Sequence, residues 1–125
     1  MDDFQFEELV GDNRVESQKD SIRNLGDPED MMIQIMSILN DTVIIPEEGE
    51  TYTFIYNAKT PNIEYDQHPI VGVTDIFNWG FRGINFHWDK IRNYTWQEIP
   101  GQLHIVRQSE IQTMLDIPYA YYLTK

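Results

Sequence analysis

The stretch PIVGVTDIFNWGFRGINFHW, residues 69–88, decides the fold. Its first part, Ile70 to Thr74, is rich in β-branched residues and follows a proline, as many strands do. Asn78-Trp79-Gly80 has the composition of a turn. After the turn, residues 84–88 alternate apolar and polar side chains with the period of two that a strand requires. We therefore predict two strands joined by a turn.

Further short strands are predicted on both sides of this stretch. Residues 51–56 alternate aromatic side chains at every second position. Residues 103–107 and 119–123 have strand composition, and a short helix is predicted to begin at Ser109 between them. Asp89 to Tyr94 is interpreted as one helical turn. The pattern predicts a β-rich body over residues 51–125.

The clearest helix signal lies before this body. Asp27 is a predicted N-cap, Pro28 stands at the first helical position, and two acids occupy the positive first turn. Apolar residues then recur at spacings of three and four at Met32, Ile35, Met36 and Leu39. A helix is predicted over about residues 28–40, with its apolar stripe packed on a sheet. A methionine-rich stripe also suits an adaptable partner surface, which is the alternative.

The N-terminal segment is acidic and has few apolar anchors. In residues 1–16, the apolar anchors expected to pack are Phe4, Phe6, Leu9 and Val10. A short helix is predicted over about residues 17–25, with Gly26 as its stop. The chain is accordingly divided into an acidic arm, residues 1–26, and one α+β domain, residues 27–125.

Five short strands with turns between them indicate the fold class. We predict an α+β protein with a small antiparallel β-barrel, SH3-like or otherwise, or a rolled sheet. One amphipathic N-terminal helix and the acidic arm complete it.

Charge and aromatic residues are distributed unevenly along the 125 residues, whose net charge is −12. Residues 1–50 hold 14 of the 21 acids, and the remainder holds 14 of the 16 aromatic residues. The acidic half repels phosphate backbones and anionic lipid, so we expect it to bind neither nucleic acid nor membrane directly. The absence of cysteine and of a signal peptide fits a protein that is made and kept in a cytoplasm, or in something assembled there.

Each common enzymatic template lacks an essential part. The glycines form neither a phosphate-binding loop nor a dinucleotide fingerprint, and no serine stands in a nucleophile elbow. We therefore expect no enzyme, no catalytic residue and no cofactor.

Three histidines leave one catalytic alternative open. His68, His87 and His104 lie on or beside three predicted strands and could converge on a metal ion, although their spacing is not diagnostic. The ordinary interpretation, without a metal, is exposed or hydrogen-bonded histidines. Asp66 and Glu64 share one strand face, which we expect to point to solvent.

The aromatic residues of the body allow three interpretations: a core, a protein-binding patch, or a base-stacking platform served by Arg82, Lys90 and Arg92. We favour a core with a protein-binding patch. The predicted partner-binding residues are Trp79, Phe81, Arg82, Asn85, His87, Trp96, Phe4 and Phe6.

Three short motifs carry further expectations. They are Tyr56-Asn57-Ala58-Lys59-Thr60, Tyr65-Asp66-Gln67-His68-Pro69 and Gly83-Ile84-Asn85-Phe86-His87-Trp88. Gly83 indicates a bulge or a close approach of backbones. Asn85 and His87 share a strand face, which serves either a local hydrogen-bond network or a partner.

In order and spacing these motifs resemble a family of small proteins of tailed bacteriophages. The resemblance covers about residues 52–88. It implies a virion or assembly protein and supplies no catalytic residue.

Two functions follow as expectations. The first is a non-enzymatic structural or assembly component of a tailed-phage virion, in a connector, tail or baseplate, that moves from the host cytoplasm into the particle. Its partners are other phage structural proteins, and it forms a homo-oligomer or ring. The alternative is an acidic phage-encoded inhibitor or DNA mimic that captures a basic, nucleic-acid-binding host protein.

Overall fold

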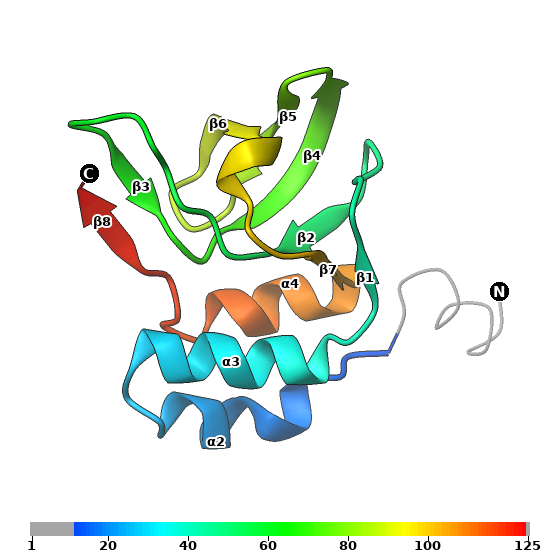
Figure 1. Ribbon diagram of the computed structural model, residues 1–125. Coiled ribbons are helices and arrows are strands. Elements are labelled where there is room, and N and C mark those ends of the chain that lie inside the picture. Colours follow the sequence, from blue (N-terminus) through cyan, green and yellow to red (C-terminus); the bar gives the residue numbers. More distant parts are fainter. Residues whose placement is uncertain (1–11, 125) are drawn as a thin grey trace, which may run out of the picture.

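Over residues 12–124, the protein has antiparallel β-structure with its three α-helices gathered on one side (Figure 1). The computed structural model describes residues 12–124 (Figure 1). Its helices are a 3-10 turn at Glu16–Gln18, α2 (Lys19–Arg23), α3 (Pro28–Ile38), a 3-10 turn at Trp96–Glu98, and α4 (Gln108–Leu115). The described helices are all too short and too polar to cross a membrane.

Within residues 12–124, eight strands form two antiparallel sheets. They are β1 (Thr42–Val43), β2 (Thr51–Thr53), β3 (Glu64–Asp66), β4 (Ile70–Phe77), β5 (Gly80–Asn85), β6 (Lys90–Thr95), β7 (Leu103–Val106) and β8 (Tyr122–Thr124). Six of them follow the order β1-β7-β2-β4-β5-β6, and β3 pairs with β8 separately. The α+β class is confirmed.

The predicted barrel is wrong, because the sheet does not close. Strands β1 and β6 are the two outer strands of the larger sheet and do not pair with each other. An SH3-like topology is not confirmed. Strand β1 is only two residues long, so it offers too few backbone hydrogen bonds to pair with β6 and close the sheet into a barrel.

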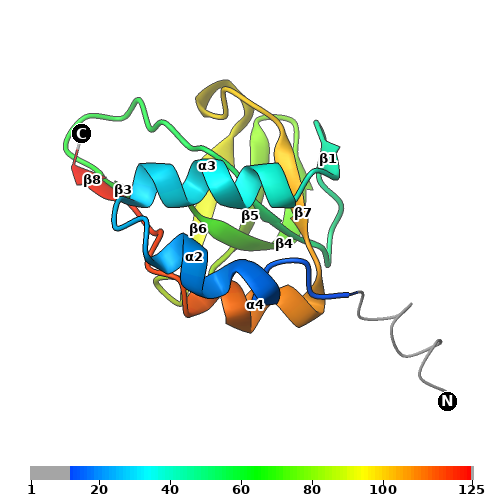
Figure 2. The same cartoon turned by 90° about the horizontal axis from the view of Figure 1, so that it is seen from below.

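The predicted helix at residues 28–40 is confirmed as α3. Asp27 accepts a hydrogen bond from the backbone N–H of Glu29, as an N-cap does. Met32 and Ile35 are buried in a core that also contains Ile70 of β4 and Met114 of α4. Seen from below, α2 lies between α3 and α4, and the three helices lie in front of the larger sheet (Figure 2). The stripe of α3 therefore serves the core.

A second core of aromatic rings fills the inside of the curved sheet. Phe54 meets Phe81 and Tyr94 edge to face, with ring centroids 5.7 and 5.4 Å apart. Tyr56 meets Tyr94 in the same way at 4.9 Å. This geometry stabilises each pair beyond the area that it buries. The body is therefore rigid around these rings.

Two local predictions differ from the structure. Residues 90–95 form β6, whereas one helical turn was predicted there. The left-handed backbone of Asp89, with φ of 55°, turns the chain back, so that Lys90 pairs with Asn85. The last strand was predicted over residues 119–123 but is β8, Tyr122–Thr124, which pairs with β3 more than fifty residues away in the sequence.

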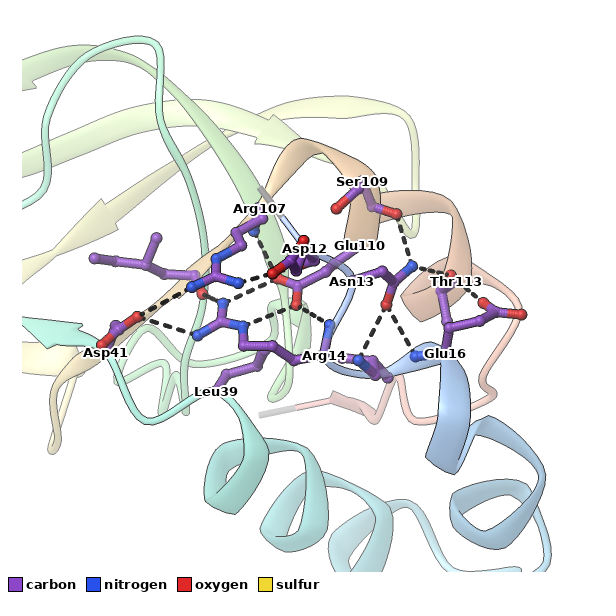
Figure 3. Close-up of polar contacts among 12 residues, drawn as sticks. Asp12, Asn13, Arg14, Glu16, Leu39, Asp41, Arg107, Ser109, Glu110 and Thr113 are labelled. Carbon is purple, nitrogen blue, oxygen red and sulfur yellow. Dashed lines mark hydrogen bonds and ion pairs between the residues drawn. The ribbon is translucent and has the colours of Figure 1, made fainter. Parts of the chain in front are cut away.

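The described part of the N-terminal segment does not reach outward as an arm. Val15 and Ile22 are fully buried in the helix-side core. Arg14 binds Glu110 of α4, with its Nε 2.9 Å from the carboxylate, and it also reaches Asp41 (Figure 3). The segment folds onto the body because this buried carboxylate needs a cation. Residues 12–26 thus belong to the domain.

Candidate functional site

Asp66 is the centre of a buried polar cluster. Its carboxylate lies 2.6 Å from Nδ1 of His87 and 3.3 Å from Nδ2 of Asn85. It also accepts backbone N–H groups of His68 and Tyr121, at 2.9 and 3.1 Å. The prediction that Asp66 points to solvent is wrong, because β3 is covered on this side, and its side chain is only 1% exposed.

The predicted local network between Asn85 and His87 is confirmed. Oδ1 of Asn85 accepts the backbone N–H groups of His87 and Trp88, which turns the chain after β5. Nδ2 of Asn85 also lies 3.3 Å from the hydroxyl of Tyr94. The second and third motifs therefore meet at Asp66, and they hold the two sheets together.

Two buried phenols adjoin this cluster. Burial raises the pKa of Tyr94 and of Tyr119, and the nearby charge of Asp66 raises both further. Both hydroxyls therefore stay protonated at neutral pH. Tyr119 shares a hydrogen bond with Thr53 at 3.2 Å. The phenols act here as fixed hydrogen-bonding groups of the fold.

The three histidines do not converge. His68 and His87 both contact Asp66, but His104 of β7 bonds the carbonyl of Leu39 instead. Among residues 12–124, no three His, Asp or Glu side chains are placed to hold a metal ion. The three histidines therefore do not have the arrangement that the metal-site hypothesis requires.

A groove of about 450 Å³ opens near the turn between β4 and β5. It is lined by Ile44, Ile45, Ile76, Phe77, Asn78, Trp96, Ile99, Gly101 and Leu103, none of which is charged. Ile44 and Ile45 are 74% and 67% exposed. These two side chains therefore give the apolar groove an exposed apolar rim.

Local chemistry explains the shape of the groove. Strand β1 ends at Val43, so the next two isoleucines have no sheet to cover them before Pro46. On the opposite wall, Nε1 of Trp96 donates to the carbonyl of Asn78 at 2.9 Å and fixes the indole. The groove is therefore preformed.

Two of the predicted partner-binding residues lie at the groove. Trp96 lines it, and Trp79 stacks on the groove residue Phe77 with ring centroids 4.9 Å apart. Arg82 lies over the other side of this pair, its guanidinium 5.1 Å from the Phe77 ring.

The remaining predicted residues do not form this surface. Phe81 and Asn85 are fully buried, so their prediction as partner contacts is corrected. The side chain of His87 is 6% exposed and lines a separate pocket with Trp88, Lys90 and Arg92. The aromatic core and the Asp66 cluster take up these side chains. Phe4 and Phe6 lie outside the described residues.

Sequence reasoning missed Ile44, Ile45, Phe77 and Ile99. One signal was present: two consecutive isoleucines before a proline cannot both face one side of a sheet. No protein-family model, curated protein or solved structure matches the chain. The geometry of the groove is therefore the basis for a functional proposal.

Proposed function

We propose that this protein is a non-enzymatic structural or assembly subunit of a tailed-phage virion, and that it docks another virion protein through the apolar groove. The observation that carries the proposal is the pair of exposed isoleucines, Ile44 and Ile45, on a groove without charged lining residues. A connector, tail or baseplate is the expected place, because such assemblies are built from small docking domains.

The energetics suit a protein partner. Covering two largely exposed isoleucines contributes about 3 kcal/mol by area alone. Trp96 adds an aromatic anchor whose indole is already fixed by its bond to Asn78. When a partner side chain enters the groove, the groove residues therefore lose little further conformational entropy.

The test is incorporation into particles. The paired variant Ile44→Ser/Ile45→Ser should fold, and virions of the phage that encodes the chain should lose it in mass spectrometry. The control is Ile33→Ser, an equally exposed isoleucine (60%) on α3, which should be incorporated normally. If the wild-type chain is missing from purified particles, the proposal is wrong.

One observation favours the alternative, an acidic inhibitor of a basic host protein. The loop that follows Ile45 carries Glu47, Glu48 and Glu50, all exposed. An apolar groove beside three carboxylates also fits a basic partner. A pull-down from host lysate should then retain a nucleic-acid-binding protein in low salt and lose it with Glu47→Gln/Glu48→Gln/Glu50→Gln.

A further inference from the structure

A second surface, which shares no lining residue with the groove, gathers three cations. Arg82 of β5 and Lys90 and Arg92 of β6 form no ion pair with any carboxylate of residues 12–124. Two open pockets of about 360 and 650 Å³ adjoin here and share Glu64 and Arg92 in their walls. In a chain of net charge −12, such a group of unpaired cations calls for an anionic partner.

Aromatic side chains hold these cations in place. The guanidinium of Arg92 lies 4.7 Å from the ring centre of Trp88, and Trp88 stacks on Tyr122 at 5.2 Å. Arg92 also donates to the carbonyl of Glu64, and Arg82 donates to the side chain of Asn93. Ile91, 66% exposed, alternates with Arg92 along the edge strand β6 and lines the larger pocket together with Arg82 and Arg92. The surface therefore combines fixed positive charge with exposed apolar area.

A buried histidine adds a second indication of a ligand. His87 lines the smaller pocket together with Trp88, Lys90 and Arg92, and its side chain is 6% exposed. Its Nδ1 is bonded to Asp66, but its Nε2 has no hydrogen-bond partner among the described residues. Buried polar atoms without a partner are rare in folded proteins, and a bound group is one common reason for them.

We propose that this surface, defined by Arg82, Trp88, Lys90, Ile91 and Arg92 and called the β6 face, binds the N-terminal residues 1–11 of a second copy of the chain. The proposal goes beyond the docking function above and uses a different surface.

The chemistry of the two partners matches. Residues 1–11 contain four carboxylates, Asp2, Asp3, Glu7 and Glu8, and neither lysine nor arginine. They also contain Phe4 and Phe6, which suit the exposed Ile91 and the Trp88–Tyr122 pair. Opposite charge beside apolar anchors gives both orientation and affinity.

The position of Asp12 favours binding of residues 1–11 to a second copy of the chain rather than to the β6 face of their own chain. Glu64, on the β3–β8 side of the molecule, borders the β6 face. The described chain begins on the opposite side of the molecule in both views (Figures 1 and 2). A path over half the surface of a domain of this size is roughly 50 Å. Eleven extended residues span at most about 38 Å, and Glu7 lies only five residues from Asp12.

Such a contact is head to tail, because the two surfaces in it are different. Heterologous contacts form a ring when the rotation between copies closes and a filament when it does not. The proposal therefore predicts self-association that depends on salt.

A charge-swap experiment on the full chain tests the proposal. Light scattering and sedimentation should show concentration-dependent association of the wild type. Lys90→Glu/Arg92→Glu should weaken it at least roughly tenfold, and so should Asp2→Lys/Asp3→Lys/Glu7→Lys/Glu8→Lys. Mixing the two variants should restore association, because the reversed arm then meets a reversed face.

Controls separate this contact from other effects. Glu47→Gln/Glu48→Gln/Glu50→Gln changes a similar number of exposed acids and should leave association unchanged. Circular dichroism and the mixing step together show that each variant is folded.

A wild type that stays monomeric at every concentration overturns the proposal, and so does a mixture that fails to associate. A single-stranded DNA oligonucleotide that binds the β6 face of a monomeric wild type also overturns it. None of these results bears on the groove.

Discussion

His87 Nδ1 lies 2.6 Å from Oδ2 of Asp66, and this contact joins β3 to the turn that follows β5. An ionised carboxylate can only accept, so Nδ1 carries the proton. The same carboxylate accepts the backbone N–H of Tyr121, which precedes β8. One buried side chain therefore connects the two-stranded sheet to the six-stranded sheet.

Asp66→Ala should strongly destabilise the fold. The substitution removes the acceptor of two side-chain donors and two backbone N–H groups, all in a buried place. We expect a loss of about 3 kcal/mol in the free energy of unfolding, measured by urea denaturation. The control Glu64→Ala, exposed on the same strand, should change it by less than about 0.5 kcal/mol. Equal midpoints for Asp66→Ala and the wild type would contradict this role.

Gly83→Ala should also destabilise the protein. A Cβ at position 83 would lie 2.5 Å from the carbonyl oxygen of Gly72 and would collide with Val71 on the neighbouring strand β4. The sequence-based prediction of a close backbone approach at Gly83 is thus confirmed. We expect a cost of about 2 kcal/mol or more, read from thermal and urea unfolding.

Gly101→Ala is the matched control for this prediction. A Cβ at position 101 meets no atom within 4 Å, so the variant should unfold within about 0.5 kcal/mol of the wild type. If both glycine variants lose the same stability, a general propensity effect is responsible and the steric argument fails.

Local signals explain which parts of the fold could be predicted. The cap of Asp27 and the stripe of α3 depend on residues close in sequence, and both predictions are confirmed. Strand β6 was missed because Asp89 adopts a left-handed backbone that its residue type merely tolerates. The burial of Asp66 depends on β8, which is distant in sequence, so alternation along β3 alone predicted the wrong side.

The candidate site was predicted only in part, for the same reason. Trp96 and Trp79 were expected at a partner surface because they are large and aromatic. Whether such a ring faces outward depends on strand pairing, and Phe81 is covered by Phe54, Tyr94 and Trp96 instead. Ile44 and Ile45 become a surface only because β1 is two residues long.

Arg14→Ala should release the N-terminal segment and destabilise the domain. Arg14 donates to Glu110 through its side chain and its backbone N–H, and Glu110 is fully buried. Breaking a buried ion pair from one side costs about 3 kcal/mol, because the other charge is left without a partner. Urea denaturation and limited proteolysis near residue 20 report the two effects. Lys19→Ala is the control: its pair with Asp116 is more exposed, and a loss below about 1 kcal/mol is expected.

The same ion pair predicts how stability depends on pH. Burial alone would raise the pKa of Glu110, but hydrogen bonds from Arg14 and from the backbone N–H of Arg107 outweigh it, and the pKa lies below its ordinary value of 4.5. Because the folded-state pKa is lowered, this contribution to stability is complete above about pH 4.5 and is lost as the pH falls through the lowered value.

Glu110→Gln should therefore be less stable than the wild type at pH 7, and the difference in free energy of unfolding should shrink below about pH 4.5. Urea unfolding between pH 7 and pH 3 measures this difference directly. Glu98 is a useful comparison, since hydrogen bonds from Thr95, Lys59 and Tyr56 also lower its pKa against the effect of burial. A difference between Glu110→Gln and the wild type that stays constant over this range would show that the carboxylate charge of Glu110 does not stabilise the fold.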